Sequence, residues 1–331
     1  MLETRALSVE EMRFFEASSG YDLDEYGTAL DDIDEQFLWP DASKPFLTIA
    51  GGYQRLPVTL ADEARRLGAS VTMQSEVMSV IVPEQSGAPC RIAVRGKDGT
   101  SRELRANKLI FAMPRHALER IAQFPLRAEP RFASLIAAVE AMPALKSLVL
   151  YARPWWHDAG IDGGLSVTDM PARMFYPVGA EKVRLSSESA KGFGVLMMYC
   201  CGSSTGWWRA AAAAPPSNSG GFQRLTADSP VVCEIHREAE TVYAQHAPAP
   251  LAGCLQDWNA GPYGGAWHYW ALGRGGRALA DQIVRPITDR ELYICGEAYA
   301  WPQQAWAEGA IDRAEFMLQR HFGLVPPKWL A

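Results

Sequence analysis

Hydrophobic and polar positions along the chain follow the period of strands in some runs and the period of helices in others. The strand pattern recurs in residues 69–82, 90–94, 101–104, 109–113, 145–151 and 291–295. The helix pattern recurs in residues 8–34, which are acidic, and in residues 57–67, 231–245 and 306–319. The chain is therefore expected to fold from helices and strands together.

Glycine and proline mark the ends of several of these runs. Gly68 ends the helix predicted over residues 57–67, and Pro114 ends the strand predicted over residues 109–113. Residues 96–99 have the turn chemistry of a hairpin tip between the two strands that flank them. Residues 209–221 have loop chemistry, and their alanine tract is interpreted as the end of a helix.

The last strand, a Gly-Glu turn, a loop and the helix over residues 306–319 form a strand–loop–helix unit. The first N–H groups of such a helix carry partial positive charge, which suits an anionic or electron-rich ligand. On spacing alone, the unit is equally consistent with a purely structural role.

Composition limits the possible functions. A chain of 331 residues can bury one large core or form two interleaved domains. A net charge of −6 without a basic cluster argues against a nucleic-acid partner. No apolar run could span a bilayer and the acidic start is not a signal peptide, so no membrane partner and a cytoplasmic location are expected. The six cysteines lack zinc-like spacing, which predicts reduced, structural thiols and no metal site.

Seven motifs occur in one order along the chain: GGYQRLP, EVMSV, KLIFAMPRHAL, ALKSLVLYARPWW, PYGGAWHYW, ICGEA and WAEGA. Their order resembles that of the flavin-dependent amine oxidase family, which includes the monoamine and L-amino acid oxidases. The resemblance covers residues 51–324. It implies an α/β fold in which a partial FAD-binding, Rossmann-like domain is interleaved with an α+β substrate-binding domain of mixed sheet and helices.

The resemblance divides the chain into four segments. The FAD domain is expected to use residues 52–115 and 261–331, and the substrate-binding domain residues 116–260. Residues 1–51 are expected to be a helical segment of the substrate-binding domain.

One part of the family pattern is missing. The family begins with a GxGxxG unit whose glycines let the backbone approach the pyrophosphate of FAD. The closest glycine cluster here, at residues 273–276, lies late in the chain and follows no clear strand. Because the sequence starts with Met1, we expect a second subunit to carry the GxGxxG unit; truncation or processing of a longer chain is the alternative. Alone, the chain is expected to hold FAD poorly.

The resemblance implies three catalytic residues. Lys146 lies among apolar strand residues, and it matches the family lysine that contacts flavin N5 through a water and assists reoxidation by dioxygen. The structural alternative is a surface lysine on the outward face of an edge strand. Trp267 and Trp306 match the two aromatic positions on either side of the substrate amine, with ordinary core packing as the alternative.

Other matched positions concern the cofactor. Glu297 matches the residue that fixes the ribityl and pyrophosphate region, and capping of the helix that follows is the structural alternative. Val77 matches a backbone contact to adenine, and Ala307 matches a residue whose N–H faces the flavin ring. Gly296 in the motif ICGEA and Ala310 in the motif WAEGA are also expected to lie at the cofactor.

Four positions are candidates for the substrate pocket: Trp258, Tyr263, Ala266 and His268. Covalent-flavin members have a cysteine where Ala266 aligns, and alanine cannot form a thioether, so non-covalent FAD is expected. A satisfied structural histidine is an equally good interpretation of His268. No arginine can be assigned to bind a substrate carboxylate, and that residue is expected on the missing part.

These residues predict a subunit of a heteromeric, FAD-dependent L-amino acid oxidase. Its substrate would be an amino acid with a bulky or aromatic side chain, and dioxygen the electron acceptor. The products would be the 2-oxo acid, ammonia and hydrogen peroxide. Three alternatives stay open: an L-amino acid 2-monooxygenase, a polyamine or monoamine oxidase suggested by the acidic residues 22–35, and a catalytically silent scaffold subunit of another oxidoreductase.

Overall fold

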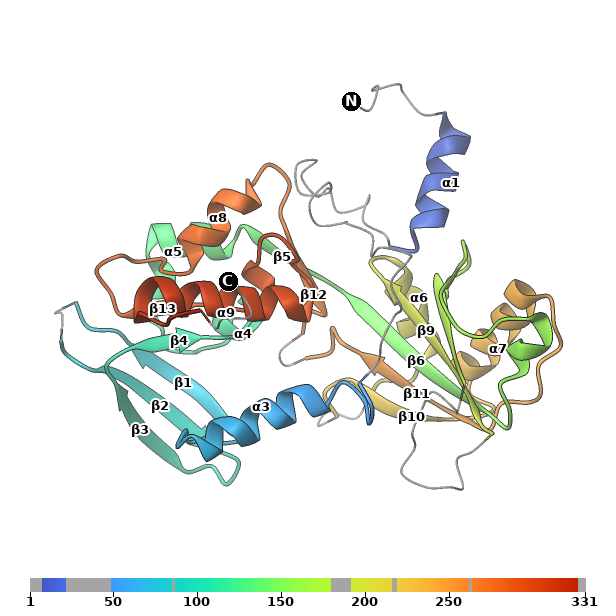
Figure 1. Ribbon diagram of the computed structural model, residues 1–331, viewed down its shortest axis with the longest axis horizontal. Coiled ribbons are helices and arrows are strands. Elements are labelled where there is room, and N and C mark those ends of the chain that lie inside the picture. Colours follow the sequence, from blue (N-terminus) through green and yellow to red (C-terminus); the bar gives the residue numbers. More distant parts are fainter. Residues whose placement is uncertain are drawn as a thin grey trace. The chain divides into compact units, whose positions relative to one another are not determined.

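The computed structural model describes residues 8–21, 49–84, 87–179, 192–215, 219–261 and 264–326. Packing divides the chain into two compact units, each assembled from separate segments (Figure 1). The first unit comprises Met1–Glu25, Phe46–Leu60 and Pro143–Pro262, and the second comprises Tyr26–Pro45, Ala61–Met142 and Tyr263–Ala331. These two units are defined by packing alone. The division of the chain into FAD-binding and substrate-binding segments therefore stays a prediction.

A six-stranded antiparallel sheet is the framework of the first unit. Its strands, in spatial order, are β10 (Phe222–Thr226), β11 (Ala252–Asp257), β6 (Ala144–Tyr151), β9 (Gly194–Cys201), β8 (Met174–Gly179) and β7 (Ser166–Val167). Side chains alternate across a strand, so Leu145, Ser147 and Val149 of β6 face one side and are buried. Lys146 and Leu148 face the other side, where Leu148 is exposed.

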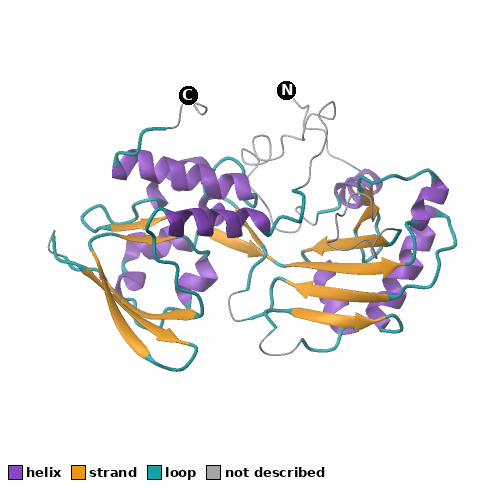
Figure 2. Ribbon diagram, turned by 60° about the horizontal axis from the view of Figure 1, so that its bottom comes forward, coloured by secondary structure: helices purple, strands orange, loops and turns teal. Residues whose placement is uncertain are grey.

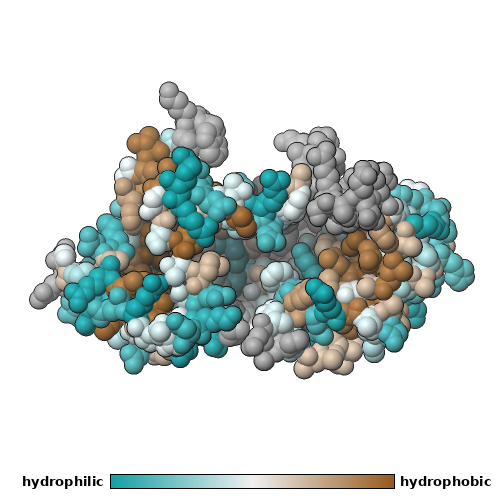
Figure 3. Space-filling view, turned by 90° about the horizontal axis from the view of Figure 1, so that it is seen from below, coloured by the Kyte–Doolittle hydropathy of each residue, from teal (hydrophilic) through white to brown (hydrophobic). Residues whose placement is uncertain are grey.

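Helices cover one face of this sheet (Figure 2). The short helices and turns of the unit are α1 (Val9–Ser19), η2 (Trp155–Ala159), α6 (Ser204–Ala211) and α7 (Pro230–Tyr243). Val232 and Ile235 of α7 pack with Trp208 of α6 against the buried residues of β6. Figure 3 shows that hydrophobic side chains remain exposed in patches on both units.

The acidic helix predicted from residue 8 is shorter than expected. Ser8 caps α1 and forms a capping box with Glu11, as its sequence favours. The helix ends at Ser19 because Gly20 adopts a left-handed conformation, with φ of 71°. The rest of the predicted run, residues 22–34, lies outside the described residues.

Glu238 of α7 is fully buried, and its carboxylate accepts a hydrogen bond from the Ala172 N–H at 2.9 Å. Burial raises the pKa of Glu238 from 4.5 to about 7. The stability that this group contributes is therefore fully present below about pH 4.5 and is lost as the pH rises through about 7. Glu238→Gln keeps an acceptor oxygen but cannot ionise. We expect its free energy of unfolding in urea to exceed that of the wild type by about 2 kcal/mol at pH 8 and to differ little at pH 4.5.

A glutamate one turn earlier supplies the control. Arg237 donates a hydrogen bond to Glu234 at 2.9 Å and lowers the pKa of Glu234, so this carboxylate stabilises the protein at pH 8 as the anion. Glu234 also helps to raise the pKa of Glu238 through its charge and a hydrogen bond, so Glu234→Gln should bring a smaller gain at pH 8 than Glu238→Gln. Equal gains in the two variants would assign the effect to the charge of the helix instead of to the buried carboxyl.

The described residues of the second unit form three small sheets. They are the antiparallel sheet of β1 (Ser75–Ile81), β2 (Cys90–Gly96) and β3 (Ser101–Ala106), the parallel pair β4 (Leu109–Phe111) and β13 (Leu292–Ile294), and the antiparallel pair β5 (Val139–Met142) and β12 (Trp267–Trp270). Its helices are α4 (Arg115–Glu119), η1 (Pro125–Ala128), α5 (Pro130–Ile136), α8 (Gly276–Ile283), η4 (Glu297–Tyr299) and α9 (Ala307–Phe322), while α3 (Arg55–Arg66) belongs partly to each unit.

Most predicted elements are present, with shifted ends. Only the second half of the strand predicted over residues 69–82 forms, as β1, because Gln74 just before it has φ of 53°. The strand predicted over residues 109–113 ends at Phe111, and only Phe111 of its residues is buried. The hairpin of β2 and β3, the strand β6 and the helices α7 and α9 are confirmed.

The molecule is an α/β protein with both strand directions: the six-stranded sheet is antiparallel, and β4 pairs with β13 in parallel. All six cysteines are free in this structure, and no two of them form a disulfide. None of the described helices is long and apolar enough to cross a bilayer.

Candidate functional site at the end of strand β13

The carboxyl end of β13 carries the Gly-Glu turn singled out in the sequence. Gly296 has φ of 131°, a conformation that favours glycine, and a Cβ atom there would meet no other atom within 4 Å. Glu297 follows directly and begins η4. Ligands of open α/β sheets bind beyond the carboxyl ends of parallel strands, so a ligand site is expected at this edge.

Helix α9 begins close to this turn in the chain. Its N-cap residue, Trp306, makes no side-chain hydrogen bond to the first turn. The N–H groups at the start of the helix are therefore not capped by the Trp306 side chain. Ala307 is the first residue of the helix, and the Ala310 N–H already donates to the Trp306 carbonyl at 3.4 Å. The start of α9 therefore offers donors and partial positive charge.

Glu297 connects two parts of the second unit. Its Oε1 lies 2.5 Å from Nδ1 of His268, which belongs to β12, and its Oε2 accepts the Ala305 N–H at 3.1 Å. The helix-capping alternative for Glu297 is thus met only in part, since Ala305 precedes the helix. Its side chain stays 28 % exposed, so the carboxylate remains open to a ligand on one side.

The turn between η4 and α9 is held in an uncommon conformation. Gln303 and Ala305 have φ of 64° and 72°, although neither is glycine. The Gln304 side chain donates to the Ala298 carbonyl at 2.7 Å, and Gly309 packs against the turn so closely that a Cβ atom would lie 2.2 Å from the Gln303 carbonyl oxygen. Uncommon conformations of this kind cluster at functional sites.

The two tryptophans predicted to face the substrate differ in environment. Trp306 is 58 % exposed, which does not suit the alternative of ordinary core packing. Trp267 is partly buried, and its Nε1 has no hydrogen-bond partner among the described residues. Alternation along β12 places Trp267 with Tyr269 on one face and His268 with Trp270 on the other. His268 therefore lies with Glu297 and not with Trp267.

Lys146 stands in the centre of the six-stranded sheet of the first unit. Its strand β6 pairs with neighbours on both sides, so the alternative of an edge strand does not hold. The ammonium group lies 4.9 Å from the ring centre of Tyr199, and burial alone lowers the pKa of Lys146. Within the described part of the chain, no carboxylate forms an ion pair with it.

Sequence reasoning missed the aromatic residues beside Lys146. Tyr199 is its cross-strand partner in β9, and the ring of Tyr21 lies edge-on to Tyr199 with a centroid distance of 6.1 Å. Tyr176 of β8 is hydrogen-bonded to Tyr21, and burial raises the pKa of both hydroxyls. Strand alternation assigns each residue to one of two faces. Which residues of β9 share the face of Lys146 depends on the register of β9 with β6, and the sequence does not give this register.

A family profile described as "Flavin containing amine oxidoreductase" matches residues 3–315 of this chain. The chain belongs to the flavin-containing amine oxidoreductase family. It is 25 % identical over 303 residues to Aplysianin-A of Aplysia kurodai, covering 85 % of this chain and 53 % of that protein. It is 27 % identical over 157 residues to an L-amino-acid oxidase of Echis ocellatus, covering 47 % of this chain and 28 % of that enzyme.

An L-amino-acid oxidase of Mus musculus is 29 % identical over 134 residues, which cover 40 % of this chain and 20 % of that enzyme. This amine oxidoreductase chain therefore spans about half the length, or less, of these relatives. The resemblance read from the motifs is confirmed.

FAD is the cofactor of this family. The residues at the end of β13 fit such a group, because the open side of the Glu297 carboxylate can accept hydroxyl hydrogen bonds and the start of α9 can donate to an anionic or electron-rich atom. Nε2 of His268, a buried polar atom that has no hydrogen-bond partner in the described part of the chain, lies beside them.

The remaining predicted positions are spread over both units of this family member. Val77 is half-buried in β1 at a register shift between β1 and β2. Ala266 hydrogen-bonds through its N–H to the Met142 carbonyl, and Trp258 of the first unit is 51 % exposed. Tyr263 lies outside the described residues. Their roles toward FAD or substrate stay predictions.

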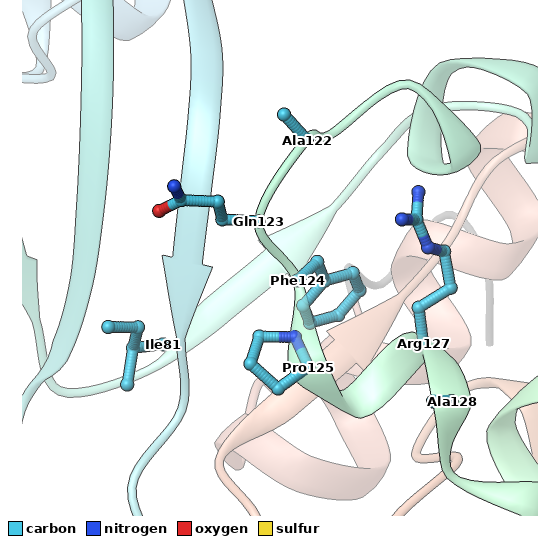
Figure 4. Close-up of a pocket in the computed structure, with 7 residues that line it drawn as sticks. All are labelled: Ile81, Ala122, Gln123, Phe124, Pro125, Arg127 and Ala128. Carbon is cyan, nitrogen blue, oxygen red and sulfur yellow. The ribbon is translucent and has the colours of Figure 1, made fainter.

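A pocket in the second unit has a different lining (Figure 4). Its lining consists of Ile81, Ala122, Gln123, Phe124, Pro125, Arg127 and Ala128. The Arg127 guanidinium, its only charged group, already donates to the Glu119 carbonyl. None of the predicted residues of the amine oxidoreductase site lines it.

Proposed function

We propose that this chain is one subunit of a heteromeric, FAD-dependent L-amino acid oxidase. The reaction converts an L-amino acid, dioxygen and water into the 2-oxo acid, ammonia and hydrogen peroxide. The observation that carries the oxidase assignment is Lys146, a half-buried cation without a carboxylate partner in the described residues, on the sheet face opposite α6 and α7. Partial burial of an ammonium group without a carboxylate partner costs free energy of folding. The fold itself does not need a lysine at this position, which favours a functional role for it.

When bound, FAD would supply the acceptor for the hydride equivalent from the substrate α-carbon. This chain supplies the surroundings of that transfer. Trp267 and Trp306 would exclude water from the amine and favour its neutral form, and Glu297 with the start of α9 would orient the cofactor. Lys146 places positive charge where dioxygen gains electrons. Water then hydrolyses the imino acid product to the 2-oxo acid and ammonia.

Two features support a partner that carries the GxGxxG unit. Parallel sheets are normally buried and have several strands, whereas β13 pairs only with β4 among the described residues. Helix α3 is amphipathic, yet none of its residues is buried and Leu56 and Leu60 are 38 % and 57 % exposed. A second polypeptide could add further strands to the sheet of β4 and β13 and could cover the apolar face of α3.

The substrate proposed is an L-amino acid with a bulky or aromatic side chain, because two tryptophans form its surroundings. FAD is held without a covalent bond, since Ala266 cannot form a thioether. Oxidative decarboxylation to an amide needs the same residues, so product analysis separates it from deamination.

Absorption spectroscopy of the purified chain, alone and co-expressed with a neighbouring gene product that carries GxGxxG, tests this function. We expect flavin bands only in the complex, and bleaching by a bulky L-amino acid under anaerobic conditions. Flavin bound to the lone chain would contradict the need for a partner. A complex without flavin would favour a silent scaffold.

A further inference from the structure

The contact between His268 and Glu297 is the closest pairing of a buried imidazole with a carboxylate in the described residues. His268 is 2 % exposed, and 2.5 Å separates its Nδ1 from Glu297 Oε1. A carboxylate only accepts hydrogen bonds, so Nδ1 carries the proton and donates it. Such a bond to an ionised acceptor is stronger than a neutral one.

The same carboxylate reaches the turn before α9. Its second oxygen accepts the N–H of Ala305, whose left-handed φ of 72° is disfavoured for alanine. Ala305 directly precedes Trp306. Glu297 thus ties β12, which carries Trp267 next to His268, to the turn that carries Trp306.

Nε2 of His268 has a different environment. It is buried, it has no partner among the described residues, and it lies 3.5 Å from the position that a Cβ atom of Gly265 would occupy. The two ring nitrogens therefore allow two roles, one through Glu297 and one toward a ligand or water at Nε2. Only the Nδ1 role has a bonded partner within the described residues.

We propose that His268 is a positioning residue that acts through Nδ1: it orients the Glu297 carboxylate, which in turn holds the left-handed turn at Ala305 and the position of Trp306. The role toward FAD rests on the proposed function, whereas the role in the turn does not. His268 touches neither cofactor nor substrate in this proposal.

Two substitutions separate the two nitrogens. The side-chain nitrogen of asparagine is attached to Cγ, as Nδ1 is, so His268→Asn can still donate to Glu297. The amide of glutamine lies one bond further out and replaces the group at Nε2, so His268→Gln loses the bond to Glu297. His268→Phe keeps the ring shape and removes both nitrogens.

Hydrogen exchange of the chain alone tests the turn. We expect the amide of Ala305, read by mass spectrometry in a peptide over residues 299–306, to exchange about tenfold faster in His268→Gln and His268→Phe. In His268→Asn it should exchange at the wild-type rate. Peptides from α7 should be unchanged in all three, which excludes global destabilisation. Equal exchange in all four proteins would overturn the proposal.

FAD titration of the complex tests the role toward the cofactor. The dissociation constant should rise about tenfold to a hundredfold in His268→Gln and His268→Phe and be rescued in His268→Asn. Retention of FAD by His268→Gln with loss in His268→Asn would overturn the proposal in favour of a contact through Nε2. If the wild-type complex holds no FAD, the proposed function fails while the exchange experiment still decides the role of His268.

Discussion

Gly309→Ala is expected to abolish cofactor retention and to lower the free energy of unfolding by about 2–3 kcal/mol. A Cβ atom at this position would lie 2.2 Å from the Gln303 carbonyl oxygen and 2.8 Å from Cβ of Ala300. The carbonyl belongs to the backbone and cannot rotate away, so α9 and the turn before it must separate. This moves the start of α9 relative to Glu297. Urea unfolding of the chain and FAD titration of the complex measure the two effects.

Gly206→Ala is the matched control. Gly206 also lies inside a helix, α6, but a Cβ atom there would meet nothing within 4 Å. Alanine in a helix is favoured over glycine by about 0.5–1 kcal/mol, so this variant should be slightly more stable and keep FAD. If Gly309→Ala behaves like Gly206→Ala, the close packing of α9 on the turn does not control the site.

The positions of the helices and strands were predictable from the sequence only in part. Periodicity located the strand β6 and the helices α7 and α9, because their apolar residues repeat at the spacing that burial requires. It failed for residues 69–74, since alternation predicts a strand but cannot detect the left-handed conformation of Gln74.

The candidate site was predictable only in part, for a similar reason. Motif order identified Glu297, Lys146 and the two tryptophans as single positions. The bond between His268 and Glu297 joins residues 29 positions apart, and Tyr199 lies on the face of Lys146 through a strand register. Such pairings depend on tertiary packing, so no local pattern in the chain encodes them.

Lys146→Met is expected to slow the oxidation of the reduced complex by dioxygen about tenfold to a hundredfold. Methionine has nearly the length of the lysine stem, so the variant removes the charge and its cation–π contact with Tyr199 while conserving much of the stem packing. Reduction by the amino acid under anaerobic conditions should change much less. Stopped-flow absorbance of the flavin, with substrate and then with oxygenated buffer, measures both steps.

The pH dependence of oxygen reactivity ties this effect to the charge of Lys146. Burial lowers the pKa of Lys146, so the wild-type ammonium loses its proton at a lower pH than an exposed lysine would. The advantage of the wild type over Lys146→Met should therefore shrink as the pH rises. Lys146→Arg, which stays charged, should keep that advantage at high pH, and Lys97→Met at an exposed hairpin tip should change nothing. Equal oxidation rates in Lys146→Met and the wild type would remove Lys146 from the mechanism.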